Sequence, residues 1–314
     1  MSNSIIRIGT RGSKLARWQT DYAVRELCKV QPGLQIEIKE IKTKGDKILD
    51  APLAKIGGKG LFTQEIEKQM LQGEIDCAVH SLKDLPTVLP QGLAIGAVPV
   101  RADARDALVS DKYQSLQDLP AGAKVGTSSL RRQAQLLAIR PDLQLVSLRG
   151  NVDTRLRKMK QEGLDAIVLA AAGLSRLQYA DRIVEYLDFA VCLPAAGQGA
   201  LALEVRQDDL RLQKLLQKIH HAETFCSVTA ERAFLCCLGG GCQVPVGAFA
   251  SLQEGRLTLR GVVAAADGSE FYRGRVQGKP EEAELLGKRL AAELLTAGGK
   301  RILRQLGIQP EEVC

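Results

Sequence analysis

The segment IIRIGTRGSKLARWQTDYAVRELCKVQPGLQIEIKEIKT (residues 5–43) has the order strand, helix, strand, and the chain of 314 residues repeats this order. The apolar run at 5–10 is typical of a strand, and residues 13–30 place apolar side chains at helical spacing. Pro32-Gly33 then interrupts the pattern before 34–43, where apolar and charged residues alternate as in a strand. This order predicts a parallel or mixed sheet with helices on both faces.

The same alternation forms two sets. The first set continues with a helix at 61–73 and a buried strand at 75–82, and the pattern resets around residues 92–105. The second set alternates strands with helices, which we expect at 123–127, 130–142, 143–150, 151–163 and 165–174. These two sets predict two α/β domains with mixed sheets.

The last third of the chain has a different pattern. A helix is predicted from Glu223 to Leu238, and another at 280–299. Between them lie three strand-like stretches, at 243–252, 256–265 and 270–278. We expect an α+β domain with a three-stranded antiparallel sheet.

Composition indicates a globular protein of the cytoplasm. Hydrophobic residues make up 45% of the chain and charged residues 25%, as in ordinary folded domains. The N-terminus has no apolar stretch of the length of a signal peptide or membrane span, so we expect neither. Eight irregularly spaced cysteines indicate free thiols. Cys236, Cys237 and Cys242 lack the paired spacing and nearby histidines of a zinc site, so we expect no metal.

The net charge of +7 favours an acidic partner. Nucleic acid fits poorly, because aromatic residues are only 4% of the chain and the basic residues form no long run. A small ligand with several carboxylates fits better, provided that the arginines converge in space.

Arginines cluster where strands lead into helices. The three junctions are IGTRGS with Arg11, VGTSSLRR with Arg131 and Arg132, and LRGNVDTR with Arg149 and Arg155. Cations are unfavourable at a helix N-terminus by roughly 0.3–1 kcal/mol, so these arginines should contribute nothing to the helices themselves. A bound carboxylate would reverse that effect. We interpret the junctions as a carboxylate-binding cleft between two α/β domains; the alternative is that each arginine only covers surface.

Asp84, in HSLKDLP, follows the end of a predicted strand. It either caps the turn before Pro86 or supplies an ionised carboxylate that holds a cationic intermediate. Lys55 and Lys59, in KIGGKG, belong either to a lid over a ligand or to a solvated connection. His80 lies in an apolar strand pattern, which favours a buried, hydrogen-bonded histidine.

Cys242 stands apart from the other cysteines. It lies in LGGGCQVPVG (238–247), directly after three glycines that leave the backbone open to close approach. No neighbouring base is evident, which argues against a hydrolytic cysteine. The remaining interpretations are a covalent attachment point and a surface cysteine without function.

Motifs along essentially the whole chain resemble the porphobilinogen deaminase (hydroxymethylbilane synthase) family. In order they are IGTRGSKLA, GDKILDAPLAKIGGKGLFTQEIE, DCAVHSLKDLPT, VGTSSLRRQAQL, LRGNVDTRL, LAAAGLSRL, LPAAGQGA and GGGCQVPVG. The resemblance implies a transferase that joins four porphobilinogen molecules head to tail, with loss of ammonia, to make hydroxymethylbilane for haem and tetrapyrrole biosynthesis. It also implies a dipyrromethane primer attached to Cys242 through a thioether.

The same resemblance assigns roles to individual residues. Asp84 becomes the catalytic carboxylate, which would stabilise the cation formed when substrate loses ammonia. Lys83, Ser129, Arg131 and Arg132 are expected to bind the cofactor. Residues expected to bind substrate are Arg11, Ser13, Lys55, Lys59, Thr127, Ser128, Arg149, Asn151, Arg155 and Arg176.

The resemblance also implies three domains, of which the first two are similar to periplasmic solute-binding proteins. We place domain 1 at 1–99 with a return segment at 200–217, domain 2 at 100–199 and domain 3 at 222–314. We expect a monomer with no nucleic-acid or membrane partner. The alternative function is a non-catalytic, carboxylate-binding receptor of the solute-binding class, which would leave Cys242 unexplained.

Overall fold

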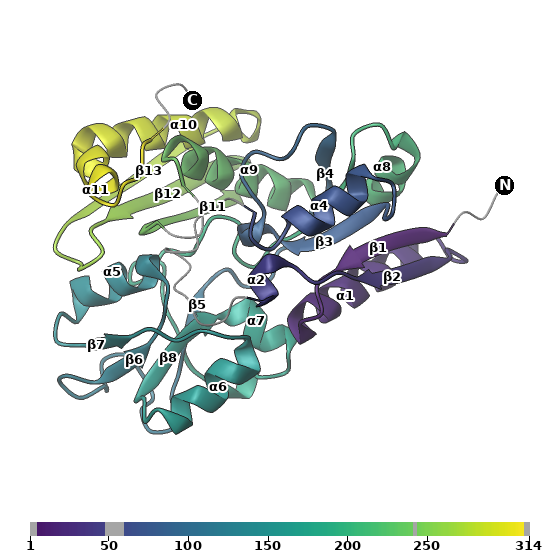
Figure 1. Ribbon diagram of the computed structural model, residues 1–314. Helices are drawn as coiled ribbons and strands as arrows, with labels where there is room; N and C mark the ends of the chain where they lie inside the picture. The colour runs from purple at the N-terminus through teal and green to yellow at the C-terminus, as the bar shows by residue number, and fades with distance from the viewer. Residues whose placement is uncertain (1–4, 48–59, 241–243, 311–314) are drawn as a thin grey trace. The chain divides into compact units, whose positions relative to one another are not determined.

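The computed structural model describes residues 5–47, 60–240 and 244–310. The chain divides into two compact units, Met1–Ala102 with Ala200–Phe225 and Asp103–Gly199 with Cys226–Cys314. The first unit contains one five-stranded sheet, and the second contains a five-stranded and a three-stranded sheet (Figure 1). Two α/β domains with mixed sheets and a C-terminal α+β domain are therefore confirmed, whereas the finer domain boundaries stay predictions.

The sheet of the first unit has the order β2-β1-β3-β10-β4. Strand β1 pairs in parallel with β2 and β3, whereas β10 is antiparallel to β3 and β4. Helices α1 and α8 contribute to one apolar cluster with the sheet, and α4 to another. The elements are β1 (Ile6–Thr10), α1 (Lys14–Val30), β2 (Ile36–Glu40), α2 (Lys44–Lys47), α4 (Gln64–Leu71), β3 (Cys77–Ser81), η1 (Leu82–Asp84), β4 (Leu93–Ala97), β10 (Leu201–Arg206), α8 (Leu210–Leu216) and η3 (Gln217–Ile219).

Both faces of this sheet are buried, as the strand patterns require. Cys77 and Val79 of β3 pack into the cluster with α1 and α8, and the intervening Ala78 packs into the cluster with α4. Successive side chains of a strand point to opposite faces, so helices must cover both. The prediction from residues 5–43 is confirmed.

The second five-stranded sheet repeats this arrangement, in the order β7-β6-β8-β5-β9. Strand β6 is parallel to β7 and β8, and β5 is antiparallel to β8 and β9. Helix α5 packs into one apolar cluster, and α6 and α7 into another. The elements are β5 (Asp106–Val109), β6 (Lys124–Gly126), α5 (Leu130–Ile139), β7 (Gln144–Val146), α6 (Val152–Gln161), β8 (Ala166–Ala170), α7 (Ala171–Arg176), η2 (Ala180–Arg182) and β9 (Ile183–Tyr186).

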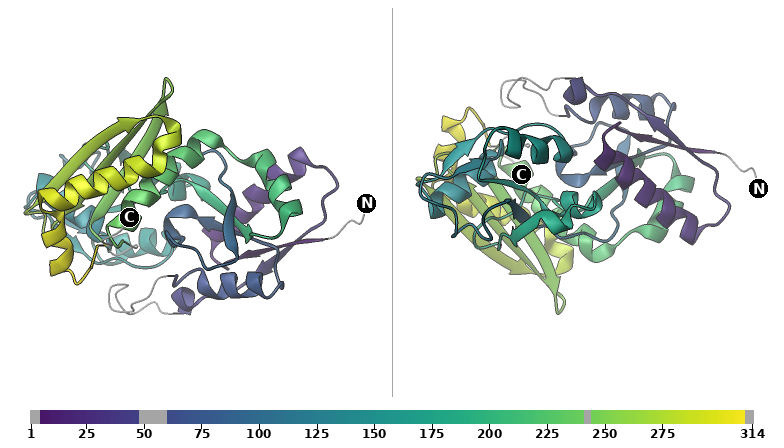
Figure 2. Two further views of the ribbon diagram at one scale, coloured as in Figure 1. Left: turned by 90° about the horizontal axis from the view of Figure 1, so that it is seen from above. Right: turned by 90° about the horizontal axis from the view of Figure 1, so that it is seen from below.

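The three-stranded antiparallel sheet has helices α9 and α10 on one face, and α10 crosses its strands in Figure 2. Gly261 allows this close approach, because a Cβ there would lie 2.7 Å from the ring of Phe234 on α9. Val262 instead packs into a cluster with Ala134 of α5 and Leu193. The elements are α9 (Ala222–Cys237), β11 (Val246–Gln253), β12 (Arg256–Ala264), β13 (Phe271–Gly278), η4 (Pro280–Glu282), α10 (Ala283–Leu294), η5 (Leu295–Gly299) and α11 (Lys300–Gln305).

Two local predictions differ from the structure. The strand expected at 165–174 ends at Ala170, because the following AAGLSR forms helix α7, and alanine is the strongest helix former. The short strands β4, β5 and β9 were not expected, since four or five residues give a weak periodic signal. The missed strand β5 proves important for the site.

His80 is buried and lies 3.0 Å from the carboxylate of Glu204, as expected for an apolar strand position. Glu67 of α4 belongs to the same polar cluster through its electrostatic coupling to Glu204 and His80. Burial raises the pKa of Glu67 above its ordinary value, and the charge of Glu204 acts in the same direction. Oε1 of Glu67 has no hydrogen-bond partner in the described part of the chain. Folding therefore raises the affinity of Glu67 for a proton.

We predict that Glu67→Gln stabilises the protein at neutral pH. When a group has a higher pKa in the folded state than in the unfolded state, its protonation stabilises the folded state at a pH below the unfolded-state pKa. This stabilisation is lost as the pH rises through the folded-state pKa. Glutamine stays neutral, so the free energy of unfolding should rise by on the order of 1 kcal/mol at pH 7.5. At pH 4 the gain should largely vanish. Urea unfolding at both pH values measures this.

The control is Glu37→Gln, at an exposed position on β2 of the same unit. It should change the unfolding free energy by less than about 0.5 kcal/mol at either pH. A Glu67→Gln protein that is less stable than the wild type at pH 7.5 would contradict the interpretation.

Candidate functional site

In the first unit, the predicted site residues follow the carboxyl ends of two neighbouring parallel strands. Arg11 and Ser13 follow β1, and Lys83 and Asp84 follow β3. Parallel strands end at the same edge of a sheet, and this edge is where α/β proteins commonly bind ligands. The structure thus brings these four residues to one sheet edge.

Arg11 is partly engaged within the protein. Its Nε lies 3.2 Å from both carboxylate oxygens of Asp46, and its guanidinium stacks 4.2 Å from the centre of the Phe62 ring. Burial alone would raise the pKa of Asp46, but hydrogen bonds from Arg11 and Thr43 hold it below its ordinary value. Ser13 caps α1 by accepting a hydrogen bond from the Ala16 N–H at 3.2 Å. Both residues therefore have structural roles besides the predicted one.

Asp84 ends the single turn η1 and is half-buried. A hydrogen bond from the Leu85 N–H to the Leu82 carbonyl closes this turn at 3.2 Å. The Asp84 carboxylate makes no hydrogen bond or ion pair with the described residues, so it does not cap the turn before Pro86. Among the described residues, this half-buried carboxylate is thus left without a partner.

In the second unit, the predicted residues also follow strand ends. Thr127, Ser128 and Ser129 follow β6, and Arg149 and Asn151 follow β7. The Oγ of Ser128 lies 3.0 Å from the Ser147 Oγ and donates to the Leu148 carbonyl at 2.9 Å, which joins the two loops. Ser129 is the N-cap of α5, and Thr127 Oγ1 accepts from the Ser129 N–H at 3.3 Å.

The arginines of these loops present donors at the same sheet edge. Arg155 and Arg176 each donate one hydrogen bond of 2.7 Å to a backbone carbonyl, of Gly150 and Gly199 respectively. The Nη1 of Arg149 is buried and has no hydrogen-bond partner in the described structure. Buried donors are rarely left without an acceptor, so this atom fits a missing ligand acceptor. Asn151 is exposed at the N-terminus of α6 and makes no capping bond.

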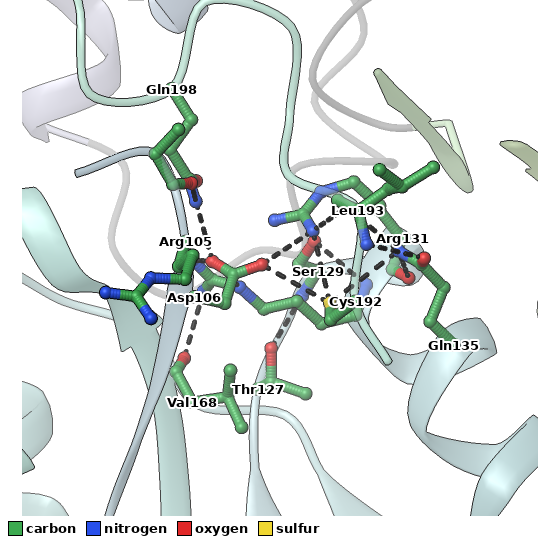
Figure 3. A network of polar contacts seen from close by, with 12 residues as sticks. Arg105, Asp106, Thr127, Ser129, Arg131, Gln135, Val168, Cys192, Leu193 and Gln198 are labelled. Carbon is green, nitrogen blue, oxygen red and sulfur yellow. Dashed lines mark hydrogen bonds and ion pairs between the residues drawn. The ribbon is translucent and has the colours of Figure 1, made fainter. Parts of the chain in front are cut away.

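Arg131 and Arg132 of α5 converge on the carboxylate of Asp106, at the centre of the contacts in Figure 3. Arg131 Nη1 lies 2.7 Å from Oδ2, and Arg132 Nη2 lies 2.7 Å from Oδ1. The Arg131 side chain is 5% exposed, that of Arg132 6% and that of Asp106 0%. Gln198 donates to Oδ1 at 2.9 Å. Two cations and one anion therefore share a largely buried site.

This network corrects one expectation. Arg131 and Arg132 were expected to contribute nothing to the helix itself and to have a bound carboxylate as their counter-ion, whereas the structure gives both a counter-ion within the protein, Asp106. Antiparallel pairing of β5 with β8 places Asp106 opposite Ala170, at the edge where the parallel strands end. The sequence signal was an acidic residue that opens the apolar run DALV, and it was missed because β5 was not predicted.

The charges in this cluster are tightly held. Burial alone would raise the pKa of Asp106, but Arg131 and Arg132 hold it far below its ordinary value. Cys192 Sγ lies 3.4 Å from Asp106 Oδ2. Burial, together with the charge of Asp106, raises the pKa of the Cys192 thiol to about 12, so this thiol stays protonated.

Three predicted residues, Lys55, Lys59 and Cys242, lie outside the described residues. Within 5–47, 60–240 and 244–310, no group of three His, Cys, Asp or Glu side chains is placed to hold a metal ion. None of the helices seen in these ranges has the length and apolarity needed to cross a membrane. The described site residues offer cationic donors in both units and a carboxylate without a partner in the first.

We predict opposite effects on stability for two arginines of the second unit. Arg131→Gln removes one partner of a buried ion cluster, and the primer-free protein should lose roughly 3 kcal/mol of unfolding free energy. Arg149→Gln removes a buried donor that has no acceptor, so stability should stay unchanged or rise by up to about 1 kcal/mol. Urea unfolding of the two primer-free variants tests the contrast. Equal losses in both would show that Arg149 has a structural partner.

The chain is similar to proteins of one family along most of its length. The family model "Porphobilinogen deaminase, dipyromethane cofactor binding domain" matches residues 6–214, and "Porphobilinogen deaminase, C-terminal domain" matches residues 225–296. Porphobilinogen deaminase of Syntrophotalea carbinolica is 54% identical over 99% of this chain and 98% of its own. That of Syntrophomonas wolfei is 56% identical over 95% of this chain and 97% of its own.

Similarity to solved structures is weaker. The methionine-binding protein MetQ is 13% identical, covers 71% of this chain and 93% of its own, and has a TM-score of 0.45. A score of this size supports no conclusion about function.

Proposed function

The chain belongs to the porphobilinogen deaminase family, and on this basis we propose that it joins four porphobilinogen molecules head to tail, releasing ammonia, to form hydroxymethylbilane. It is a transferase of tetrapyrrole biosynthesis. The observation that carries the proposal is the carboxylate of Asp84, which has no partner among the described residues and lies at the sheet edge that also holds Arg11 and Lys83. Family membership disfavours the alternative of a carboxylate-binding receptor.

The described residues fit a dipyrromethane primer. Such a primer carries carboxylates, and the buried Nη1 of Arg149 is a donor without an acceptor. Nε and Nη2 of Arg131 likewise make no hydrogen bond to the described residues. We propose that Arg131 and Arg132, with Lys83 and Ser129, hold primer carboxylates and that Cys242 provides the thioether. When bound, the primer would supply the pyrrole carbon to which the first substrate is joined, and each later substrate would be joined to the unit added before it.

We propose that the other hydrogen-bond donors of the predicted site bind the substrate. Porphobilinogen has an acetate and a propionate side chain, and guanidinium groups bind carboxylates through paired hydrogen bonds. The residues that we propose for this role within the described structure are Arg11, Ser13, Thr127, Ser128, Arg149, Asn151, Arg155 and Arg176. Lys55 and Lys59 are proposed from the sequence alone.

Asp84 performs the catalytic step in this proposal. Loss of ammonia from the substrate leaves positive charge on the pyrrole and its methylene carbon. A carboxylate that accepts a hydrogen bond from the pyrrole N–H stabilises this charge. After the new carbon–carbon bond has formed, the same carboxylate can take up the proton that the ring must lose. Because the arginines neutralise the substrate carboxylates, Asp84 is the carboxylate that balances the positive charge at the reacting pyrrole.

The six described cysteines are all free thiols, which supports the predicted cytoplasmic location. The monomeric state and the absence of nucleic-acid and membrane partners stay predictions.

We predict that purified wild-type protein has a mass above the 34.0 kDa of its polypeptide by one dipyrromethane. Cys242→Ser should fold but carry no pyrrole adduct and show no turnover, because serine is a far weaker nucleophile than a thiolate. Intact-mass spectrometry before and after addition of porphobilinogen measures both forms. Cys236→Ser, which alters a half-buried thiol of α9, is the control and should keep the adduct. An adduct on Cys242→Ser with full activity would contradict the assignment.

We predict that Asp84→Asn lowers turnover by roughly a hundredfold or more, the effect of removing one preorganised electrostatic contact. Asparagine keeps the shape of the side chain and loses its negative charge. The rate of hydroxymethylbilane formation by primer-loaded enzyme is the measurement. Asp21→Asn, at an exposed position on α1 of the same unit, should turn over at the wild-type rate. A near-normal rate in Asp84→Asn would remove Asp84 from the mechanism.

A further inference from the structure

We propose that Asp106 is a positioning residue for the primer, a role that rests on the function proposed above. Its carboxylate fixes the guanidinium groups of Arg131 and Arg132, so that their remaining N–H groups are held ready for primer carboxylates. It also leaves the buried cluster with a single positive charge, which the primer neutralises.

The hydrogen bonds of Asp106 show that it acts through other residues. Oδ1 accepts from Arg132 Nε at 3.0 Å, Arg132 Nη2 at 2.7 Å and Gln198 Nε2 at 2.9 Å. Oδ2 accepts from Arg131 Nη1 at 2.7 Å and contacts Cys192 Sγ at 3.4 Å. The side chain is fully buried and both oxygens are engaged, so Asp106 does not itself contact a ligand.

Each guanidinium group also donates to a backbone carbonyl. Arg131 Nη1 donates to the Leu193 carbonyl at 2.6 Å, and Arg132 Nη1 donates to the Val168 carbonyl at 2.9 Å. A side chain held by two acceptors in a close-packed site has little rotational freedom left to lose on binding. Much of the ordering that carboxylate binding requires is therefore complete in the folded protein.

The donors left over belong to Arg131. Its Nε and Nη2 form no hydrogen bond to the described residues, although the side chain is only 5% exposed. These groups lie at the N-terminal end of α5, where the helix dipole adds positive potential. Two guanidinium charges and one carboxylate leave a net charge of +1 in a site of low dielectric. A ligand carboxylate is the group that this site lacks.

The neighbouring charged side chains described here do not balance the positive charge of the Asp106 cluster. Arg105 Nε and Nη2 bond to the carboxylate of Asp103, and the Arg105 side chain points away from the Asp106 carboxylate in Figure 3. Arg273 of β13 approaches Gln135 Oε1 at 3.5 Å and adds a cation on this side. Cys192 is a protonated thiol. The balance of charge around Arg131 therefore stays positive until a ligand binds.

The experiment measures primer uptake by the full-length chain, purified from cells that make no porphobilinogen. Porphobilinogen is added well below the melting temperature, and mass spectrometry follows the gain of dipyrromethane per folded molecule. Asp106→Asn should slow uptake by roughly tenfold or more, since misplaced binding groups lose their effective concentration. Asp106→Glu retains the charge but shifts both arginines by one methylene, and it should also slow uptake.

The matched control is Glu231→Gln. Glu231 is a fully buried carboxylate in the same unit, where it accepts from the Gly197 N–H at 2.7 Å and the Ala250 N–H at 2.8 Å. Its loss should destabilise the fold without changing primer uptake per folded molecule.

Thermal melting separates positioning from a merely structural role. In Asp106→Asn the gap in melting temperature between primer-loaded and primer-free protein should exceed the wild-type gap, because primer carboxylates become the counter-ions of both arginines. A structural role alone would lower both melting temperatures equally.

Primer uptake at the control's rate in Asp106→Asn would overturn the proposal. If that variant does not fold without primer, uptake at the control's rate in Asp106→Glu would overturn it instead. A wild-type protein that gains no primer mass would remove the proposed function itself. If the wild type gains primer mass and the Asp106 variants gain it at the same rate, only the positioning role of Asp106 is contradicted.

Discussion

The carboxylate of Asp106 between the guanidinium groups of Arg131 and Arg132 is the interaction on which the second unit depends. Two cations cannot stay buried at a helix N-terminus without a counter-ion, because desolvation and mutual repulsion would both oppose folding. One carboxylate satisfies the fold but does not balance the charge. The same buried cluster therefore stabilises the fold and keeps a net positive charge.

Strand topology explains why the cluster can exist. In each five-stranded sheet four strands run in one direction, and a single antiparallel strand, β10 or β5, lies between β3 and β4 or between β8 and β9. The first residue of an antiparallel strand lies at the edge where the parallel strands end. In the second sheet this residue is Asp106, and in the first it is Leu201, which pairs with Ser81 just before Lys83 and Asp84.

The segment just before β10 makes hydrogen bonds both to the arginine cluster and to the turn that carries Asp84. Gln198 donates to the Ala104 carbonyl at 2.8 Å and to Asp106, whereas the Ala200 carbonyl accepts from the Leu82 N–H at 3.0 Å. A short stretch of chain thus supports the arginine cluster of one unit and the turn that carries Asp84 in the other. Of the residues proposed for the site, those of the second unit are mainly cationic donors, and those of the first include the carboxylate of Asp84.

The sequence by itself determined the longer strands and helices, the two mixed sheets and the antiparallel sheet, and the loops that carry the proposed site residues, because these follow from local periodicity and short motifs. It also pointed to Asp84, whose carboxylate the structure leaves without a described partner. Only the tertiary structure decided what Arg131 and Arg132 contact, since Asp106 reaches them through pairing between β5 and β8, which are far apart in the chain. Long-range pairing of a four-residue strand leaves almost no local pattern, and the burial of a charge depends on everything packed around it.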